Sequence, residues 1–558
     1  MRLVECVPNF SEGRDAAKIE RITNEIRTTE GVKLIDVDPG KDTNRTVVTF
    51  IGTPEGVLEA AFRAIAKAAE VIDMRTHAGA HARMGATDVC PFVPVAGVTM
   101  EDCAALARSL GERVGSELGI PVYLYEEAAS RPERRNLANI RQGEYEGLAE
   151  KLKDPAWKPD FGPAEFNPTS GATVIGAREF LIAYNVNLNT RDVRIAREIA
   201  FEIREKGRAR RDASGAIMKD ESGETVFAPG KFRACKAVGW YMEDFARAQI
   251  SMNLVNYRVT PPHLVFDECV KLAESHGVHV TGSELVGLIP LEAMLQAGRH
   301  YLAKQKKTTG VPEQELIHIA ALSMGMGDLY PFEAEKKIIE YQFRTEGPLV
   351  GMKVNAFTDV LSTDAPAPGG GSVAALCGAL SGALSSMVAA LTYGKHGYEA
   401  AFAEMEIAGV RAQALKAAFL EDVDRDTEAF NRVMDAMRLP KGTEAEKKAR
   451  EGAIQEATAG ATRVPLDVLR RSREAAELAR LVVEKGNRNS ISDGGVAALA
   501  ARTAAEGAFL NVAINLPGID DERFRKETLA EAERLRGEIV RHAEETVRLA
   551  ERSIAKAQ

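Results

Sequence analysis

The pattern of apolar and polar residues changes once along the chain, and this change restricts the fold more than any other feature. Up to about residue 331, short apolar segments typical of strands alternate with amphipathic segments typical of helices. From Lys353 to Gln558 strand patterns nearly vanish, and long Ala-, Glu- and Arg-rich segments follow one another between short Gly- and Pro-containing turns. The sequence therefore predicts an α+β half fused to an all-α helical bundle.

The α+β half contains two units with a similar order of elements. Each resembles the pattern β-α-β-β-α-β, which places helices on one side of a sheet. We predict an N-terminal subdomain over residues 1–172, a second subdomain over 173–331, a linker over 332–352 and a helical domain over 353–558. The segment from Ala209 to Lys231 is polar and Gly-rich, so we expect a surface hairpin or loop there.

One uncharged segment, Gly369 to Gly394, is long enough to cross a membrane. It consists mainly of Ala, Gly and Ser, and Gly378, Gly382 and Ser386 recur every fourth residue, so they share one helix face. Such a face lets two helix backbones approach closely. The pattern favours a buried helix in a helical domain that forms homo-oligomers over a membrane span.

Composition and charge favour a cytoplasmic enzyme over several other classes. The net charge of the 558 residues is -9, whereas nucleic-acid-binding proteins usually carry a basic surface. The six cysteines are scattered without a CxxC pair, which argues against a zinc ribbon or a disulfide framework. The segment MRLVECVPNF lacks the apolar core of a secretory signal. We expect no nucleic-acid partner and no membrane partner.

A histidine pair in the segment RTHAGAHARMGATD is the first candidate for chemistry. His77 and His81 are four residues apart, but Gly79 interrupts any helix, and no glutamate follows the first histidine as it does in metalloproteases. Acid–base catalysis is a stronger alternative, since imidazole exchanges protons near neutral pH. Arg83 and Arg75 offer guanidinium groups that match a carboxylate. Two loop histidines that bond to the backbone are the third alternative.

The helical half offers further polar candidates. Gly369, Gly370, Gly371 and Ser372 precede a long helix, where glycines allow close approach and free N–H groups attract oxygen acceptors. In the segment EDVDRDTEAF, Asp422 and Asp426 share a helix face, although most such acids are solvated surface. Asn489, Ser490 and Asp493 are polar groups at a later helix start, where Asp493 also suits an N-cap.

Several longer motifs resemble a known family. The segments VECVPNFSEG, LIDVDPGKDTNRTVVTFIG, HAGAHARMGATDVCPFVPV and DFGPAEFNPTSGATVIGAREFLIAYNVNLN are similar to the formiminotransferase half of the formimidoyltransferase-cyclodeaminases. The segments PAPGGGSVAAL, DRDTEAFNRVMDAMRLPKGT and NSISDGGVAALAARTAAEGAFLNVAINL resemble the cyclodeaminase half. The resemblance covers nearly the whole chain.

The resemblance implies a bifunctional folate enzyme of histidine degradation. Such an enzyme moves the formimino group of N-formimino-L-glutamate to N5 of tetrahydrofolate, and then closes the ring to 5,10-methenyltetrahydrofolate with release of ammonia. Its partners would be small molecules: formiminoglutamate, and tetrahydrofolate as a co-substrate that carries a polyglutamyl tail. No metal and no bound redox cofactor would be needed.

The resemblance also assigns roles to residues of this chain. The catalytic histidine of the first site falls on His81, and the acid–base carboxyl of the second falls on Asp426. Candidates for orienting the substrate are His77, Arg83, Asp38, Asn44 and Arg45. Candidates for contacts at the second site are Gly369, Gly370, Gly371, Ser372, Asn489, Ser490 and Asp493. The folate-contacting segment falls on Gly162, Pro163, Ala164, Glu165, Phe166, Asn167, Pro168, Thr169, Ser170 and Gly171.

Two alternatives remain open at this point. The helical domain also resembles methenyltetrahydrofolate cyclohydrolases, which add water where a cyclodeaminase expels ammonia. The second alternative is a folate-binding scaffold without turnover, against which the presence of both His81 and Asp426 argues.

Overall fold

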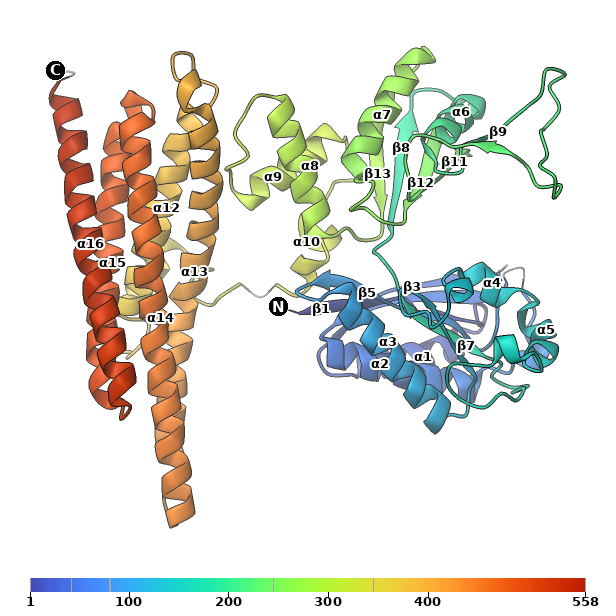
Figure 1. Cartoon of the computed structure of the whole chain (residues 1–558), viewed down its shortest axis with the longest axis horizontal. Coiled ribbons are helices and arrows are strands. Elements are labelled where there is room, and N and C mark those ends of the chain that lie inside the picture. The colour runs from blue at the N-terminus through green and yellow to red at the C-terminus, as the bar shows by residue number, and fades with distance from the viewer. Residues whose placement is uncertain (1, 42, 80–81, 244, 345, 557–558) are drawn as a thin grey trace. The chain divides into compact units, whose positions relative to one another are not determined.

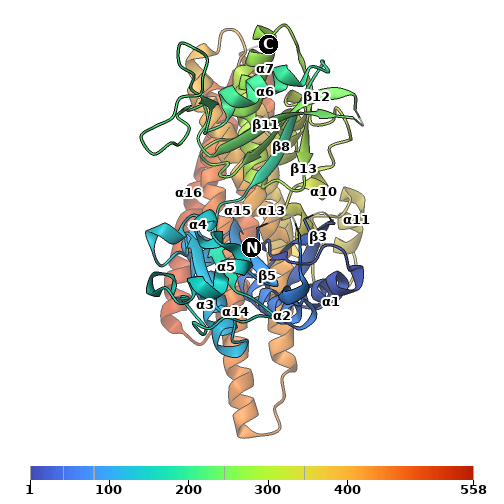
Figure 2. The same cartoon turned by 90° about the vertical axis from the view of Figure 1, so that its right-hand side faces the viewer.

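The computed structural model describes residues 2–556 except positions 42, 80, 81, 244 and 345 (Figures 1 and 2). The chain packs into two compact units, which are described separately. One consists of Met1–Ala293 and Met326–Gln342, and the other of Met294–Gly325 and Phe343–Gln558. The first unit is built from sheets and helices and the second from helices, so the predicted fold class is confirmed.

The first unit begins with a seven-stranded sheet. Strand β3 pairs with β4, β4 pairs with the short consecutive strands β1 and β2, and both of these pair with β5. Strand β7 pairs in parallel with β5, and β6 pairs in parallel with β7. The strands are β1 (Leu3–Cys6), β2 (Asn9–Phe10), β3 (Val32–Gly40), β4 (Arg45–Gly52), β5 (Thr87–Ala96), β6 (Val122–Glu126) and β7 (Thr173–Ala177).

Helices cover one face of this sheet, and alternation along the strands separates the two faces. On β4, Val48 and Phe50 are fully buried, whereas Arg45, Val47 and Thr49 on the other face are only half-buried. The covering helices are α1 (Ala16–Arg27), α2 (Pro54–Val71) and α3 (Met100–Glu117). Helices α4 (Leu137–Arg141) and α5 (Glu144–Lys151) cover the β6–β7 end of the opposite face. The remainder of that face is open and forms the floor of a cleft.

Strand β7 belongs to the first sheet and not to the second subdomain, where the sequence predicted it. Thr173 was predicted to start the second subdomain, but Thr173–Ala177 pairs in parallel with β5 and β6 of the first sheet. The segment from Thr173 to Asn189 looks like one continuous strand pattern, because the break at Arg178–Leu181 carries no strong turn residue. Parallel pairing joins distant segments, so local pattern does not reveal it.

A four-stranded antiparallel sheet of order β11-β12-β8-β13 forms the rest of the first unit. Helices α6 and α7 pack on one of its faces. The elements are β8 (Ile182–Leu188), α6 (Val193–Ile203), β11 (Cys235–Met242), β12 (Arg247–Leu254), α7 (Pro262–Ser275) and β13 (Val280–Val286). The predicted polar segment forms a narrow projection that begins with β9 (Arg208–Ala209) and ends with β10 (Phe227–Ala228), which pair with each other.

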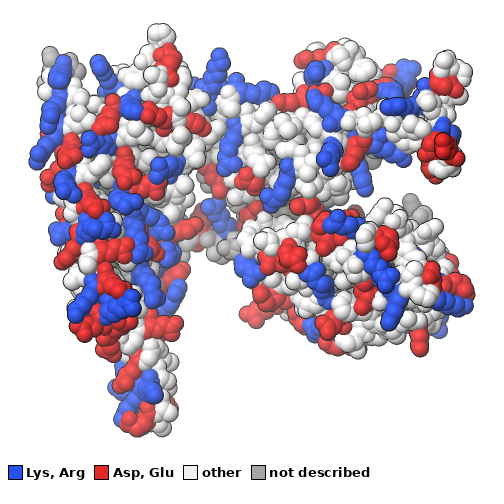
Figure 3. All heavy atoms as spheres, in the orientation of Figure 1, with Lys and Arg blue, Asp and Glu red and all other residues white. Residues whose placement is uncertain are grey.

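The second unit is a bundle of long helices, and its α13–α14 hairpin extends past the other helices (Figures 1 and 2). Acidic and basic side chains are interspersed along the exposed helix faces (Figure 3). The helices are α11 (Val354–Leu361), α12 (Gly370–Thr392), α13 (Phe402–Arg438), α14 (Glu444–Lys485), α15 (Ile491–Asn515) and α16 (Glu522–Ala555). Helix α8 (Leu291–Lys304) begins in the first unit, α9 (Glu313–Ser323) belongs to the second, and the short α10 (Ala334–Lys337) to the first.

Helix α12 is the uncharged segment singled out from the sequence, and it is long and apolar enough to cross a membrane. Here it packs among α13, α14 and α15. Gly378 lies against the ring of Phe419 and Gly382 against the backbone of Ala412, so two of the regularly spaced small residues bring α12 close to α13. The close approach explains why glycine and serine replace larger apolar residues on this face.

Candidate active sites

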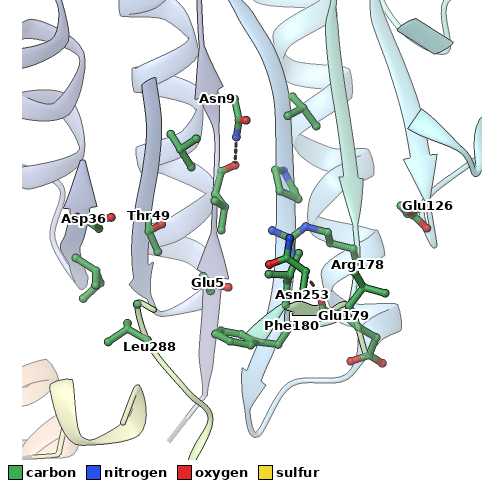
Figure 4. A pocket seen from close by; sticks show the side chains of 18 of the residues that line it. Glu5, Asn9, Asp36, Thr49, Glu126, Arg178, Glu179, Phe180, Asn253 and Leu288 are labelled. Carbon is green, nitrogen blue, oxygen red and sulfur yellow. Dashed lines mark hydrogen bonds between the residues drawn. The ribbon is translucent and has the colours of Figure 1, made fainter. Parts of the chain in front are cut away.

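The open face of the first sheet forms the floor of a cleft of about 1370 Å³ (Figure 4). The floor comes from alternate residues of neighbouring strands, and part of a wall comes from Lys236 and Asn253 of the second sheet. The floor residues are Glu5, Val7, Asn9, Arg45, Val47, Thr49, Val89 and Pro91. The cleft therefore combines apolar surface with charged groups at fixed positions, as small-molecule sites do.

Glu5 is a buried carboxyl on this floor. Its exposed fraction is 5%, and within the described residues it makes no hydrogen bond or ion pair. Burial raises the pKa of Glu5 from 4.5 to about 7, and the charge of Arg178 lowers it. Glu5 therefore holds a proton at neutral pH far more readily than an ordinary glutamate.

Arginines supply positive charge to the same cleft. Arg45, Arg141 and Arg178 all line it. Arg141 forms an ion pair with the fully buried Asp88, whose Oδ1 also accepts the Met84 N–H at 3.0 Å. Burial lowers the pKa of Arg45, while the charge of Asp88 raises it. Guanidinium groups fixed in this way are suited to bind the carboxylates of a small anionic substrate.

The histidine segment lies beside Asn44, at the start of β4. His77 Nε2 donates to the Asn44 carbonyl at 2.8 Å, and His77 Nδ1 accepts from Arg83 Nε at 3.3 Å. The Asn44 side chain donates to the Ala78 carbonyl at 3.0 Å. A Cβ on Gly79 would lie 2.1 Å from the Thr43 carbonyl, so the loop requires glycine there. For His77 the structure shows the hydrogen-bonded loop alternative, and His81 lies outside the described residues.

Arg83 is already occupied by carboxylates of its own chain. Its guanidinium donates to Glu144 at 3.1 Å and to Glu146 at 2.5 Å, and only 9% of its side chain is exposed. Arg75 is likewise paired with Asp73. The expectation that these arginines hold a substrate carboxylate is therefore not met in this arrangement. Arg83 instead fixes the ring of His77.

The segment from Gly162 to Gly171 runs beside α5 and the histidine segment. Tyr145 donates its hydroxyl to the Pro168 carbonyl at 2.5 Å, and its ring lies 5.4 Å from that of Phe166. Asn167 Oδ1 accepts the backbone N–H groups of Thr169 and Ser170 and so sets the loop conformation. As far as the structure describes the chain, this segment does not line the cleft. Nor does it line the shallow pocket of about 510 Å³ that includes His77 and Arg83.

Asp38 lies on β3 opposite Val47 of β4, and its charge acts on Arg45. The structure thus brings Asp38, Asn44, Arg45, His77 and Arg83 into one region at the start of β4. Their role in orienting a substrate remains a prediction.

The helical unit places Asp426 against the first turn of α12. The Ser372 hydroxyl lies 3.2 Å from Asp426 Oδ2 and 2.9 Å from the Val423 carbonyl. A Cβ on Gly371 would lie 2.1 Å from Asp426 Oδ1, so glycine makes room for the carboxyl. Burial raises the pKa of Asp426, and the hydrogen bonds from Ser372 lower it. The glycine-rich helix start and the aspartate, noted separately in the sequence, therefore form one site.

The neighbouring acids of α13 have structural partners. Asp422 is fully buried and pairs with Arg425 and Arg471. Asp424 accepts the backbone N–H of Leu349 at 2.8 Å. Asp426 is half-buried, and no ion pair with it occurs among residues 2–556 as described. Of the three aspartates, Asp426 is the one left available for chemistry.

Asn489, Ser490 and Asp493 lie at the other end of α12. Helix α15 runs antiparallel to α12: Gly507 of α15 packs on Ala374, and the Asn487 N–H donates to Thr392 Oγ1 at 2.8 Å. Helix α12 has 23 residues, so its ends are roughly 33 Å apart. Within one chain, these residues and Asp426 therefore lie at opposite ends of α12 and do not share one site.

Comparison with known proteins decides the family. Models described as the formiminotransferase domain, N-terminal subdomain, the formiminotransferase domain and formiminotransferase-cyclodeaminase match residues 3–178, 183–344 and 353–534. A formimidoyltransferase-cyclodeaminase of Dictyostelium discoideum is 42% identical over 98% of this chain and 97% of its own length. The chain belongs to the formiminotransferase-cyclodeaminase family.

Shorter relatives match one part of the chain each. A glutamate formimidoyltransferase of Thermoplasma acidophilum is 47% identical over 54% of this chain and 93% of its own length. A methenyltetrahydrofolate cyclohydrolase of Methylorubrum extorquens is 45% identical over 33% of this chain and 89% of its own length. Each half thus has a free-standing counterpart.

Sequence reasoning missed three groups that line the cleft, namely Glu5, Arg141 and Arg178. Only Glu5 carries a local signal, since it is a charge in the middle of the otherwise apolar strand LVEC. The described residues contain no group of three or more His, Cys, Asp or Glu that is arranged to hold a metal ion.

Proposed function

We propose that this chain transfers the formimino group of N-formimino-L-glutamate to N5 of tetrahydrofolate and then releases ammonia to give 5,10-methenyltetrahydrofolate. The observation that carries this proposal is the half-buried Asp426 carboxyl on the α12 helix start, which forms no ion pair with any described residue, in a chain whose other unit has a cleft lined by arginines. The relative matched over 98% of this chain is named for both activities.

The first reaction needs a proton acceptor and a proton donor. N5 attacks the amidine carbon and loses its proton, and the bond from that carbon to the glutamate nitrogen breaks with its electron pair, so this nitrogen takes up a proton. We assign both transfers to His81, since one imidazole can accept and then return a proton. His77, held by Arg83, orients the loop, and the cleft arginines bind the glutamate carboxylates.

The second reaction has the same proton balance on a different pair of nitrogens. The formimino group enters as its amidinium cation. N10 attacks the formimino carbon and loses its proton, and the amidinium nitrogen takes that proton up. The carbon–nitrogen bond then breaks with its electron pair, so ammonia departs and the positive charge stays on the methenyl ring. We assign both transfers to Asp426. Its raised pKa brings proton uptake and release closer to neutral pH, and Ser372 holds the carboxyl in place.

A coupled assay with formiminoglutamate and tetrahydrofolate tests the proposal. We expect methenyltetrahydrofolate and ammonia in equal amounts. His81→Ala should remove transfer but leave ring closure of supplied 5-formiminotetrahydrofolate, and Asp426→Asn should do the reverse. Methenyltetrahydrofolate hydrolysis without ammonia release would instead support a cyclohydrolase, the function named for the Methylorubrum relative. Folate binding without turnover would support a scaffold.

We further infer that the chain acts in the cytoplasm on polyglutamylated folate. Lys236 and Arg178 line the cleft and can pair with the carboxylates of a glutamyl tail. The KM for pentaglutamyl tetrahydrofolate should therefore be lower than that for the monoglutamate, and Lys236→Ala should reduce the difference. Equal KM values in the unaltered enzyme would contradict the inference.

We infer that copies of the chain associate through α12 and α15. Leu380 and Leu391 of α12 are 52% and 50% exposed, and Leu510 and Ile514 of α15 are 65% and 76% exposed. These adjacent helices thus present large apolar side chains to solvent, which marks an interface. Ile514→Asp should shift the molecular mass in light scattering toward that of a smaller species.

A further inference from the structure

The projection from β9 to β10 has no core of its own, and we call these residues, 208–228, the arm (Figure 1). Every residue from 210 to 224 is exposed to solvent. Backbone hydrogen bonds nevertheless join three short segments of the arm: the Arg210 N–H donates to the Val226 carbonyl at 2.8 Å, that of Val226 to Met218 at 3.0 Å and that of Met218 to Arg210 at 2.9 Å. Because so small a ribbon is only marginally stable in water by itself, an ordered arm of this kind needs a partner.

Two turns of the same sequence pattern, Asp-x-Ser-Gly, shape the arm. In the first turn, Asp212 Oδ1 accepts the backbone N–H of Ser214 at 2.8 Å and also its hydroxyl at 2.6 Å. In the second turn, Asp220 Oδ1 accepts the corresponding groups of Ser222 at 2.9 Å and 2.7 Å. Both aspartates are thus used within their own turns. The other charged side chains therefore decide what each turn presents to a partner.

The two turns present opposite charge. Arg210 and Arg211 lead into the first turn, and neither forms an ion pair with any described residue. Glu221 and Glu224 belong to the second turn and are likewise without an ion pair in the described part of the chain. Lys219 precedes the second turn and donates to the hydroxyl of a threonine within the arm. With the turn aspartates and Lys219 included, the first turn is net positive and the second is net negative.

Two apolar side chains link the turns. Ile217 is 45% exposed and Met218 is 40% exposed. The arm therefore presents a basic turn, an apolar middle and an acidic turn in that order along the chain. A surface with this order is self-complementary, because a two-fold axis through the apolar middle sets the acidic turn of one copy against the basic turn of the other.

We propose that the arm binds the arm of a second copy of this chain in a two-fold contact. The two arginines of each copy pair with the two glutamates of the other, and Ile217 of one copy meets its counterpart near the axis. The contact is distinct from the association through α12 and α15. It does not depend on the proposed reactions, because the arm does not line the cleft as far as the structure describes the chain.

The charge pattern favours a second copy over partners of a single charge. A nucleic acid or an acidic peptide would be attracted by Arg210 and Arg211 but repelled by Glu221 and Glu224, and a basic partner would meet the reverse. A second arm satisfies both turns at once. It also covers the apolar middle, which a partner held at one turn alone would leave in water.

Light scattering of the full-length protein and of two charge-reversal variants tests the contact. One variant combines Glu221→Lys with Glu224→Lys, and the other combines Arg210→Glu with Arg211→Glu. The aspartates that shape the turns stay in place. In either variant like charges face each other at both ends of the contact, so we expect its dissociation constant to rise about tenfold or more. The mass should fall to half that of the unaltered protein or less.

An equal mixture of the two variants is the decisive measurement. The basic arm of one variant then meets the acidic arm of the other, so both ends attract again and the mass should return to that of the unaltered protein. Mixing would not repair an arm that had merely lost its structure. Glu112→Lys combined with Glu274→Lys is the control. It changes the charge of exposed positions on α3 and α7 by the same amount as the lysine variant and should leave the mass unchanged.

A cross-link then locates the contact. Ile217→Cys places a thiol near the axis, so a short bis-maleimide should join two chains of this variant. Of the native cysteines, five are buried and Cys377 is half-buried, so the unaltered protein is the control and should give no such product. A mass that stays unchanged in either charge-reversal variant would overturn the proposal. So would a mixture that does not regain the mass, or an Ile217→Cys variant that gives no joined chains.

Discussion

Glu5→Gln should make the protein more stable at high pH, and the gain in stability over the unaltered protein should grow as the pH rises. Glu5 is 5% exposed on the cleft floor, and burial raises its pKa from 4.5 to about 7. In the unfolded chain the same carboxyl ionises near 4.5. As pH rises from 4.5 to 7, unfolding therefore releases a proton, and the folded state loses stability relative to the unfolded state. Glutamine carries no such proton, so the variant escapes this loss.

The magnitude follows from the two pKa values. Each pH unit between them is worth about 1.4 kcal/mol, so the full destabilisation well above pH 7 is ~3 kcal/mol. From pH 5 to pH 8 the advantage of the variant should grow by about 2.5 kcal/mol. With an unfolding entropy of about 2.1 cal/mol/K per residue over a unit of roughly 300 residues, this equals ~4 °C in Tm.

Calorimetric scans of both proteins at half-unit pH steps measure this difference. Any fixed cost of burying an amide shifts the Tm of the variant equally at every pH. The slope of the Tm difference against pH is therefore the informative quantity. Glu112→Gln, on the exposed side of α3, is the control and should give a flat difference. A flat difference for Glu5→Gln as well would show that the buried carboxyl ionises normally and would refute the reasoning.

Three further predictions concern the two sites. Gly371→Ala places a Cβ 2.1 Å from Asp426 Oδ1, so ammonia release should fall at least tenfold while transfer persists. Gly537→Ala on α16, whose Cβ meets nothing within 4 Å, is the control and should retain both activities. Because burial raises the pKa of Asp426 and the carboxylate must accept a proton, the rate of ammonia release should decline on acidification at a higher pH than an ordinary aspartate would give. Arg141→Lys replaces a guanidinium fork on the buried Asp88 with a point charge, so it should lower Tm and raise the KM for formiminoglutamate several-fold in steady-state assays.

The fold could be predicted from the sequence wherever local periodicity decides it. The alternation in β4 and the long amphipathic helices after Lys353 are examples, because each pattern reports burial over successive residues. The place of β7 could not be predicted, since parallel pairing with β5 and β6 depends on segments about 50 to 85 residues away. Local sequence determines an element more strongly than it determines the neighbours of that element.

For the candidate sites too, the sequence revealed individual residues but not the partners that the fold brings to them. Gly371, Ser372 and Asp426 were recognised separately, and the packing of α12 on α13 joins them. Arg83 was expected to bind substrate, but two glutamates of α5 already occupy it, and nothing in the segment HARMG reveals those partners. A charged side chain shows its chemistry in the sequence, whereas its availability depends on which opposite charges the fold brings near.

The length of α12 restricts how the second site can be completed. Asp426 lies at its first turn, and Asn489 and Asp493 lie near its last, roughly 33 Å away. One chain therefore cannot use both groups on one small ligand. A two-fold axis across the middle of α12, where Leu380 is exposed, would place the last turn of one copy beside the first turn of the other. If the residues near Asn489 contact ligand at all, the second site requires two copies, and a monomeric variant should lose ammonia release while its transferase remains.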